Sequence, residues 1–347
     1  MRSRPPPILL AIVLGSLFAS PGPAAQVCDT LGAVGRFAFL ARSTFTTHSG
    51  GMSPGNQFPV GFIGNVCTDH ARVQAIELQP SLGRPYLVAT RASGTALRLV
   101  APPPRYSYTP NYIDGEIATG GGGVVGPATF FVNGTEDHTG NHIDTSGALP
   151  QVQACRQAMT DAQAASIAFA ALPPTQVMGA VRVGRGEVLT IDARGGAVIR
   201  MDSLKLEGAP GQCPGYRNIC DCFQGSETSR IEFLRNAGDQ LVLNVDKLAI
   251  GSCARFYIDP SGDRVPTVVN LAGPGKRVTV GFEARAYDVN ILAPERTLSV
   301  TGAGLDTETQ VGTAWVKRAR LQGFTYFGVA TRPCSASPAF VDEPDPF

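Results

Sequence analysis

Residues Val188 to Leu206 read VLTIDARGGAVIRMDSLKL and set the pattern that governs the C-terminal half of this chain. The stretch holds three short apolar runs, Val188–Ile191, Val198–Met201 and Leu204–Leu206, which are separated by glycine or by polar residues. A doubly wound α/β fold needs longer strands that alternate with helices. The pattern therefore excludes that fold and predicts a chain built mainly from short β-strands.

Similar short runs continue toward the C-terminus. They are Ile231–Leu234, Leu241–Val245, Phe256–Ile258, Val268–Leu271, Val278–Val280, Val289–Leu292, Leu298–Val300 and Ala314–Val316. A β-sandwich and a parallel β-solenoid both use strands of this length. A sandwich is built from hairpins, yet the chain has a single Asn-Gly pair, Asn133-Gly134. Single glycines at uneven spacing are typical of solenoid corners, so we expect a parallel β-solenoid.

The remaining chain supplies one helix and an N-terminal β-rich part. Val152 to Leu172 is rich in alanine and is followed by Pro173-Pro174, which predicts a long helix over 152–172. Because its apolar residues are mostly alanine, we expect it to pack along the side of the solenoid. We assign residues 111–334 to the solenoid. Residues 26–110 form either a cap or early coils.

The N-terminus predicts export. Arg2 and Arg4 precede an apolar run from Ile8 to Ala19, and small residues lead to a cleavage site before Gln26. This pattern is typical of a signal peptide over residues 1–25 and is too short for a membrane span. We expect a secreted, cell-surface or periplasmic protein without a membrane span, ending in a flexible acidic tail over 335–347.

Cysteine content agrees with an oxidising compartment. An even number of cysteines in an exported chain predicts disulfides, although their pairing cannot be deduced from spacing. A metal site on Cys213, Cys220 and Cys222 is the alternative, but Cys-x-Cys is not the usual zinc spacing. The eight cysteines are Cys28, Cys67, Cys155, Cys213, Cys220, Cys222, Cys253 and Cys334.

Several segments, taken in order, resemble the choice-of-anchor A family of exported bacterial surface proteins. They are Asp114–Gly121, the helix at 152–172, Gly238–Val245, Val268–Leu271, Asn290–Pro294 and Gly312–Lys317. The resemblance covers about residues 114–328 and implies a right-handed β-solenoid with a helix along its side, an architecture shared with bacterial ice-binding and adhesin modules. The chain departs from the family in its cysteine-rich insert Gly208–Ser229 and in lacking a C-terminal anchor. These departures favour secretion or matrix association over anchoring.

Two sequence motifs could suggest catalysis, and both have simpler explanations. Gly51–Gly55 fits the G-x-S-x-G nucleophile elbow, but Pro54 has no N–H to complete an oxyanion hole. Gly121-x-Gly123-x-x-Gly126 fits a dinucleotide fingerprint, but Pro127 and a β-prone run follow where a helix is needed. We therefore expect a coil corner at these glycines, no catalytic residue and no cofactor.

The segment Glu136–Asp144 holds the weak candidates for a metal site. His138, His142 and Asp144 are ligand types, although Gly140-Asn141 argues against the helix that would align the two histidines. A solvated loop is the alternative. Both possibilities stay open at this point.

The low charge content of the chain limits the classes of function that are possible. Of 347 residues 16% are charged and the formal net charge is +1, which excludes a nucleic-acid binder driven by bulk charge. We expect a non-enzymatic adhesin-like or structural module whose partner is a matrix protein, a polysaccharide or a cell surface.

Two other functions remain as alternatives. Ice binding would need threonines repeated on one flat face, and the candidates are Thr190, Thr267, Thr279, Thr297 and Thr313. A secreted polysaccharide lyase or hydrolase would need converging charged groups, for which Asp246 with Lys247 and Arg285 with Asp288 are possible pieces.

Overall fold

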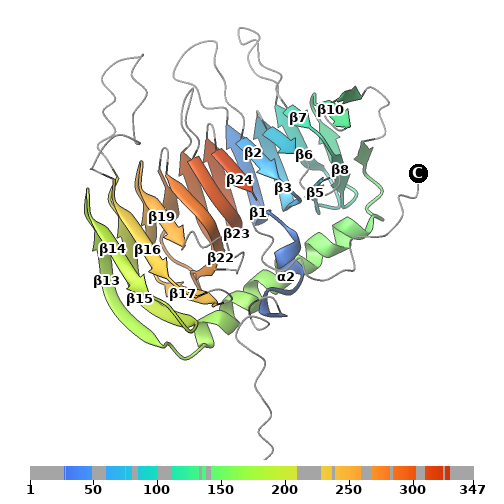
Figure 1. Ribbon diagram of the computed structural model, residues 1–347. Coiled ribbons are helices and arrows are strands. Elements are labelled where there is room, and N and C mark those ends of the chain that lie inside the picture. The colour runs from blue at the N-terminus through green and yellow to red at the C-terminus, as the bar shows by residue number, and fades with distance from the viewer. Residues whose placement is uncertain are drawn as a thin grey trace, which may run out of the picture.

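The computed structural model describes residues 27, 29–48, 60–74, 76–79, 85–100, 111–132, 135–137, 142–208, 228–236, 239–258, 267–281, 284–301, 309–322 and 325–328. These residues form a mainly β structure with one long helix (Figure 1). The expected signal peptide and acidic tail lie outside the described residues, as does the Gly51–Gly55 motif.

The strands form three parallel ladders, which we call faces A, B and C. Face A holds β5 (Tyr86–Ala89), β8 (Glu116–Thr119), β12 (Ile143–Asp144), β17 (Leu241–Val245) and β20 (Thr267–Asn270). Face B holds β6 (Thr95–Val100), β9 (Gly123–Val125), β18 (Leu248–Ile250) and β21 (Val278–Val280). Face C holds β2 (Val60–Ile63), β4 (Ile76–Gln79), β7 (Asn111–Ile113), β10 (Thr129–Val132), β14 (Val188–Asp192), β16 (Arg230–Leu234), β19 (Arg255–Ile258) and β24 (Thr325–Gly328).

Longer strands bend from one face to the next. The strands that run from face A onto face B are β1 (Phe39–His48), β3 (Val66–Gln74), β13 (Gln176–Val183) and β15 (Ala197–Leu206). The two that take part in all three ladders are β22 (Arg285–Thr301) and β23 (Thr309–Gln322). Each circuit of the chain therefore stacks on the next one, as expected for a β-solenoid.

The direction of the paired strands distinguishes the two candidate folds, because a β-solenoid has parallel strands and a β-sandwich is built from antiparallel hairpins. Within the described residues, every strand pair is parallel except β10 with β11 (Thr135–Asp137), which is antiparallel. The Asn133-Gly134 pair lies outside the described residues. The parallel architecture is confirmed, and its right-handed sense stays a prediction.

The stacking order differs from the chain order. Strand β1 pairs with β3 on one side and with β23 on the other. The chain therefore starts in the middle of the stack and winds out to β10. It then runs back along the stack as α2 (Pro150–Ala171) and restarts at β13 and β14 at the opposite end (Figure 1). From there it winds back until β23 and β24 close against β1 and β2, at a junction we call the seam.

An aromatic cluster fills the interior at the seam. Phe39, Phe45, Phe62 and Phe327 are fully buried. Their ring centroids are separated by 4.9 Å for Phe39 and Phe327, and by 5.4 Å for Phe62 and Phe327. These rings come from both ends of the described chain, so burial of large aromatic surface joins the two halves of the solenoid.

The predicted helix is confirmed and begins two residues earlier than expected, because Pro150 occupies its first turn. Ala158, Ala162 and Ala165 are buried against face A. Small side chains at this spacing let the helix approach the sheet closely. This packing explains the high alanine content from which burial along the side of the solenoid was predicted.

Polar groups bind the helix to the sheet. Asn270 Nδ2 donates to the carbonyl oxygen of Ser166 at 2.9 Å and to Asn244 Oδ1 at 2.8 Å. Ser166 Oγ donates to Asn270 Oδ1 at 2.6 Å, and Asn244 Nδ2 donates to the Phe169 carbonyl at 2.8 Å. All of these groups are buried, so the network is satisfied without water.

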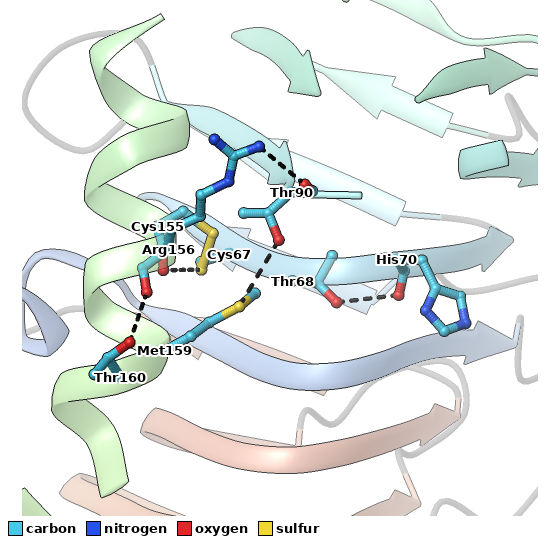
Figure 2. The surroundings of a disulfide bond; sticks show 8 residues. All are labelled: Cys67, Thr68, His70, Thr90, Cys155, Arg156, Met159 and Thr160. Carbon is cyan, nitrogen blue, oxygen red and sulfur yellow. Dashed lines mark hydrogen bonds between the residues drawn. A yellow bond between two sulfur atoms is a disulfide. The ribbon is translucent and has the colours of Figure 1, made fainter. Parts of the chain in front are cut away.

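A disulfide adds a covalent link between α2 and β3. Cys67 and Cys155 are bonded across a sequence separation of 88 residues. Figure 2 shows this bond beside Arg156, whose Nη2 donates to the carbonyl oxygen of Thr90 at 3.4 Å. Cys253 is also disulfide-bonded. The other five cysteines, including the alternative metal set, lie outside the described residues: Cys28, Cys213, Cys220, Cys222 and Cys334.

Glycines mark coil corners. Gly121 and Gly126 have φ of +112° and +109°, and a Cβ on Gly126 would lie 1.8 Å from the Leu99 carbonyl oxygen. No helix follows them, since β10 begins at Thr129. The predicted coil corner is confirmed at these glycines.

Candidate binding face

The three faces differ in what covers them. Face A lies beneath α2, which buries outward side chains such as Val242, Leu292 and Trp315, whereas Val177 and Arg200 at the β13 end of this face are exposed. Faces B and C carry outward side chains that are exposed or partly exposed. A ligand that binds a flat face therefore has faces B and C available.

Register alignment creates a row of side chains along face B. On face B, one outward residue of each coil lies in register with an outward residue of the next coil. We call the row that these residues form the face B column. Its members in order along the stack are Arg182, Lys205, Ala249, Thr279, Ser299, Arg320, Thr46, Arg72, Arg98 and Val125. The column contains five cations and no carboxylate.

Flanking residues on face B have the same character. Thr297, Arg318, Thr44 and His70 lie in register on one side of the column. Thr301, Gln322 and His48 lie in register on the other side. The central part of face B therefore presents cations, hydroxyls and amides.

Four arginines on face B form what we call the arginine cluster: Arg72, Arg98, Arg318 and Arg320. Within the described residues, none of them makes an ion pair with a carboxylate. Arg182 and Lys205, near the β13 end, differ because both pair with Glu207, at 2.6 Å and 3.2 Å. The uncompensated positive charge of face B is thus concentrated around the seam.

The electrostatic effect of the cluster appears at His48, the last residue of β1. Burial lowers the pKa of the His48 imidazole below its ordinary value of 6.5, and the charges of Arg320 and Arg72 lower it further. A cationic surface disfavours a further positive charge. The same potential attracts anions.

A groove at the β13 end of face B offers no acid–base pair. It has a volume of about 580 Å³ and is lined in part by Arg182, Arg185, Lys205 and Glu207. Hydrogen bonds from Arg182 and then Lys205 hold the pKa of Glu207 below its usual range. Glu207 therefore stays ionised and is a poor proton donor at neutral pH.

Face C has a mixed character instead. Arg230 and Glu232 form an ion pair on β16, and Val188 and Leu234 are exposed apolar residues near the same end. Outward charges of both signs lie along this face, so it lacks the continuous positive potential of face B.

The metal candidates are not brought together as a ligand set in the described residues. His142 is buried and its ring stacks on Phe130 with a centroid distance of 4.9 Å. Asp144 Oδ1 accepts a hydrogen bond from the Ser146 N–H at 2.6 Å. His138 lies outside the described residues, and the described part contains no cluster of three or more potential ligands.

The threonines considered for ice binding fall on different faces. Thr279 and Thr297 lie on face B and Thr190 lies on face C. Thr267 and Thr313 are buried on face A, and Thr267 lies in register with the interior residues Leu241 and Val289. Because they lie on different faces, these threonines do not form one repeated surface. Sequence spacing alone does not reveal the register between coils, which decides the face on which each threonine lies.

Only one of the two pairs considered for a lyase site has described side chains. Asp246 and Lys247 are exposed at a corner, where the Asp246 carbonyl accepts a hydrogen bond from the Arg296 guanidinium. The side chains of Arg285 and Asp288 lie outside the described part. The arginine cluster is not recognisable in the sequence, since its members are far apart along the chain and only strand register aligns them.

Among the described residues, no helix is both long enough and apolar enough to cross a bilayer. No family model and no curated protein matches this chain.

Solved structures similar to this chain include three ice-binding proteins. The ice-binding protein of the Antarctic ascomycete Antarctomyces psychrotrophicus is 15% identical, with 86% of this chain and 97% of that chain covered and a TM-score of 0.40. The glycosylated ice-binding protein LeIBP from an Arctic yeast is 12% identical over 86% and 92%, with a TM-score of 0.42. The DUF3494 domain of Shewanella frigidimarina ice-binding protein_1 is 14% identical over 86% and 95%, with a TM-score of 0.35. Because these scores are low, the description of the fold rests on the strand pairing.

Proposed function

We propose that this chain is an exported, non-enzymatic binding module that holds an extracellular macromolecule against face B. The face B column carries this proposal, because it aligns exposed cations and hydroxyls over successive coils with no carboxylate among them. A long flat ladder distributes binding over many contacts, as an adhesin-like or matrix-associated protein requires.

Two features support export. The Cys67–Cys155 bond and the disulfide at Cys253 suit an oxidising compartment. The N-terminal pattern of basic, apolar and small residues is typical of a signal peptide. Secretion is therefore part of the proposal, and the cleavage site is expected before Gln26.

The experiment blocks one face at a time. Thr279 on face B and Thr190 on face C are exposed threonines, and each is replaced by cysteine and coupled to a polyethylene glycol chain. Binding to matrix extracts and whole cells is then measured. We expect loss of binding only for the chain attached at position 279. Equal binding by both conjugates, or no binding by the unmodified protein, would rule out the proposal.

Ice binding is the second candidate function. The structural neighbours named above are ice-binding proteins, and the observation on this chain that favours the activity is the row Ala249, Thr279 and Ser299. These small residues lie side by side in three adjacent coils, and hydroxyl and methyl groups can order water. Lys205 and Arg320 bound the row on both sides.

Thermal hysteresis tests this second candidate. Activity that disappears in Thr279→Tyr but persists in Thr190→Tyr would support ice binding by face B. An unmodified protein that shows no hysteresis at high concentration would rule it out.

A further inference from the structure

We infer that the ligand of face B is a linear acidic polysaccharide whose carboxylate or sulfate groups bind the arginine cluster. This inference rests on the proposed function and specifies its substrate class.

Three of the four arginines lie in one line along the stack. Arg320 and Arg72 flank Thr46 in register, and Arg98 lies in register beside Arg72. Neighbouring strands lie about 4.8 Å apart, so Arg72 and Arg98 are one step apart and Arg320 is two steps from Arg72. A linear polymer with recurring negative charges can contact several of these positions at once.

Without a bound anion, the closely spaced arginines of this line destabilise the folded protein. Like charges on directly adjacent strand positions repel each other, as Arg72 and Arg98 do here. In the described residues the cluster has no carboxylate to offset the repulsion. A bound polyanion supplies the missing charge, and its arrival displaces counterions from both partners.

The residue type specifies the kind of anion. All four members of the cluster are arginines, whose planar guanidinium donates two parallel hydrogen bonds to a carboxylate or sulfate. Thr44 and Thr46 lie between the arginines of β23 and those of β3 and β6. Their hydroxyls, with the amide of Gln322, offer donors and acceptors that suit the hydroxyl groups of a sugar ring.

Other polyanions fit this face less well. Single-stranded nucleic acids bind aromatic side chains that stack on bases, and membrane surfaces bind helices that insert large apolar residues. The apolar outward residues of face B in the described chain are Ala180, Ala249, Val100 and Val125. None of these four residues is aromatic, so in the described part of face B the rings that could stack on a base are the imidazoles of His48 and His70, which flank the face B column. None of the four is large enough to anchor the face in a bilayer.

The experiment uses the purified protein and immobilised polymers. Dextran sulfate and polygalacturonate are the acidic probes, and dextran is the neutral probe. The triple variant Arg72→Gln, Arg98→Gln, Arg320→Gln is compared with Arg194→Gln, Arg200→Gln, Lys276→Gln. The second set removes the same charge from exposed residues outside face B.

We expect the protein to bind one or both acidic glycans and not dextran. The face B triple variant should raise the Kd by at least about tenfold and make its salt dependence shallower, whereas the matched variant should bind nearly as the unmodified protein. Both variants must unfold at a temperature no lower than that of the unmodified protein, so that any loss of binding is not a loss of folding. Equal loss in both variants, or equal binding to dextran, would overturn the inference.

Two further measurements distinguish an acidic polysaccharide from other anionic ligands, and failure of this inference from failure of the proposed function. Tighter binding to phosphatidylserine vesicles or duplex DNA than to either acidic glycan, lost in the face B variant, would overturn the polysaccharide assignment. If the polyethylene glycol chain at position 279 blocks cell binding while neither acidic glycan binds, the inference fails and the proposed function stands. If neither cells nor glycans bind, both fail.

Discussion

The ring of Phe39 on β1 lies edge-on to the ring of Phe327 on β24, with their centroids 4.9 Å apart. This pair joins the first and last described strands of the solenoid, since β24 pairs with β2 and β1 pairs with β23. The seam is therefore packed like any other part of the interior, although its strands come from opposite ends of the chain.

Phe327→Ala should destabilise the protein by about 3–5 kcal/mol, because it removes a buried aromatic ring and leaves a cavity at the seam. Urea unfolding followed by the fluorescence of Trp315, the single tryptophan, measures the change. Phe233→Ala, at a buried phenylalanine in the other half, is the matched control with a similar expected cost. A loss below about 1 kcal/mol at Phe327 alone would show that the seam contributes little to stability.

Replacing Cys67 and Cys155 together by alanine should lower the free energy of unfolding by about 2–5 kcal/mol. The bond closes a loop of 88 residues, and its loss increases the entropy of the unfolded chain. Denaturant unfolding under oxidising conditions measures the difference and leaves the other disulfides formed. The helix should remain in the folded variant by far-ultraviolet circular dichroism, and an unchanged midpoint would contradict the expectation.

Asn270→Ala should cost about 2–4 kcal/mol, because it leaves the Ser166 carbonyl and hydroxyl and Asn244 Oδ1 without their partner. Ser166→Ala removes one hydrogen bond and should cost about 1 kcal/mol. Urea unfolding of the two single variants and of the double variant measures their coupling. Strictly additive losses would contradict the shared network.

His48 should titrate below pH 6.5, and Arg320→Gln should raise its pKa. Imidazole proton shifts in an NMR titration report both values. Since the folded pKa is depressed, the unfolded chain binds more protons below pH 6.5, so stability falls as the pH drops toward the folded pKa. Arg200→Gln, on face A, should leave the titration unchanged. A His48 pKa at or above 6.5 in the unmodified protein would contradict the positive potential of face B.

Local patterns predicted most elements of this fold. The runs at Val188–Ile191 and Leu204–Leu206 became strands because apolar residues at alternate positions face the interior, and α2 followed from alanine content and the flanking prolines. The corner between β7 and β8 falls at Gly115, where a Cβ would lie 2.3 Å from the Pro85 carbonyl oxygen.

Long-range pairing could not be predicted in the same way. No local signal indicates that β1 pairs with β23, because parallel pairing between distant strands depends on the register of every coil between them. The candidate face depends on the same information. Arg72, Arg98 and Arg320 appear as unrelated surface residues until register places them in one row.

The position of β1 also affects how the protein can fold during synthesis. The edge of β1 that pairs with β23 stays open until β23 has been synthesised. Until then, the backbone N–H and C=O groups along that edge have no strand partner. Late closure of this kind makes folding slow and favours unwanted strand addition between chains. An oxidising compartment that forms the Cys67–Cys155 bond early would hold the first half in its native arrangement during that wait.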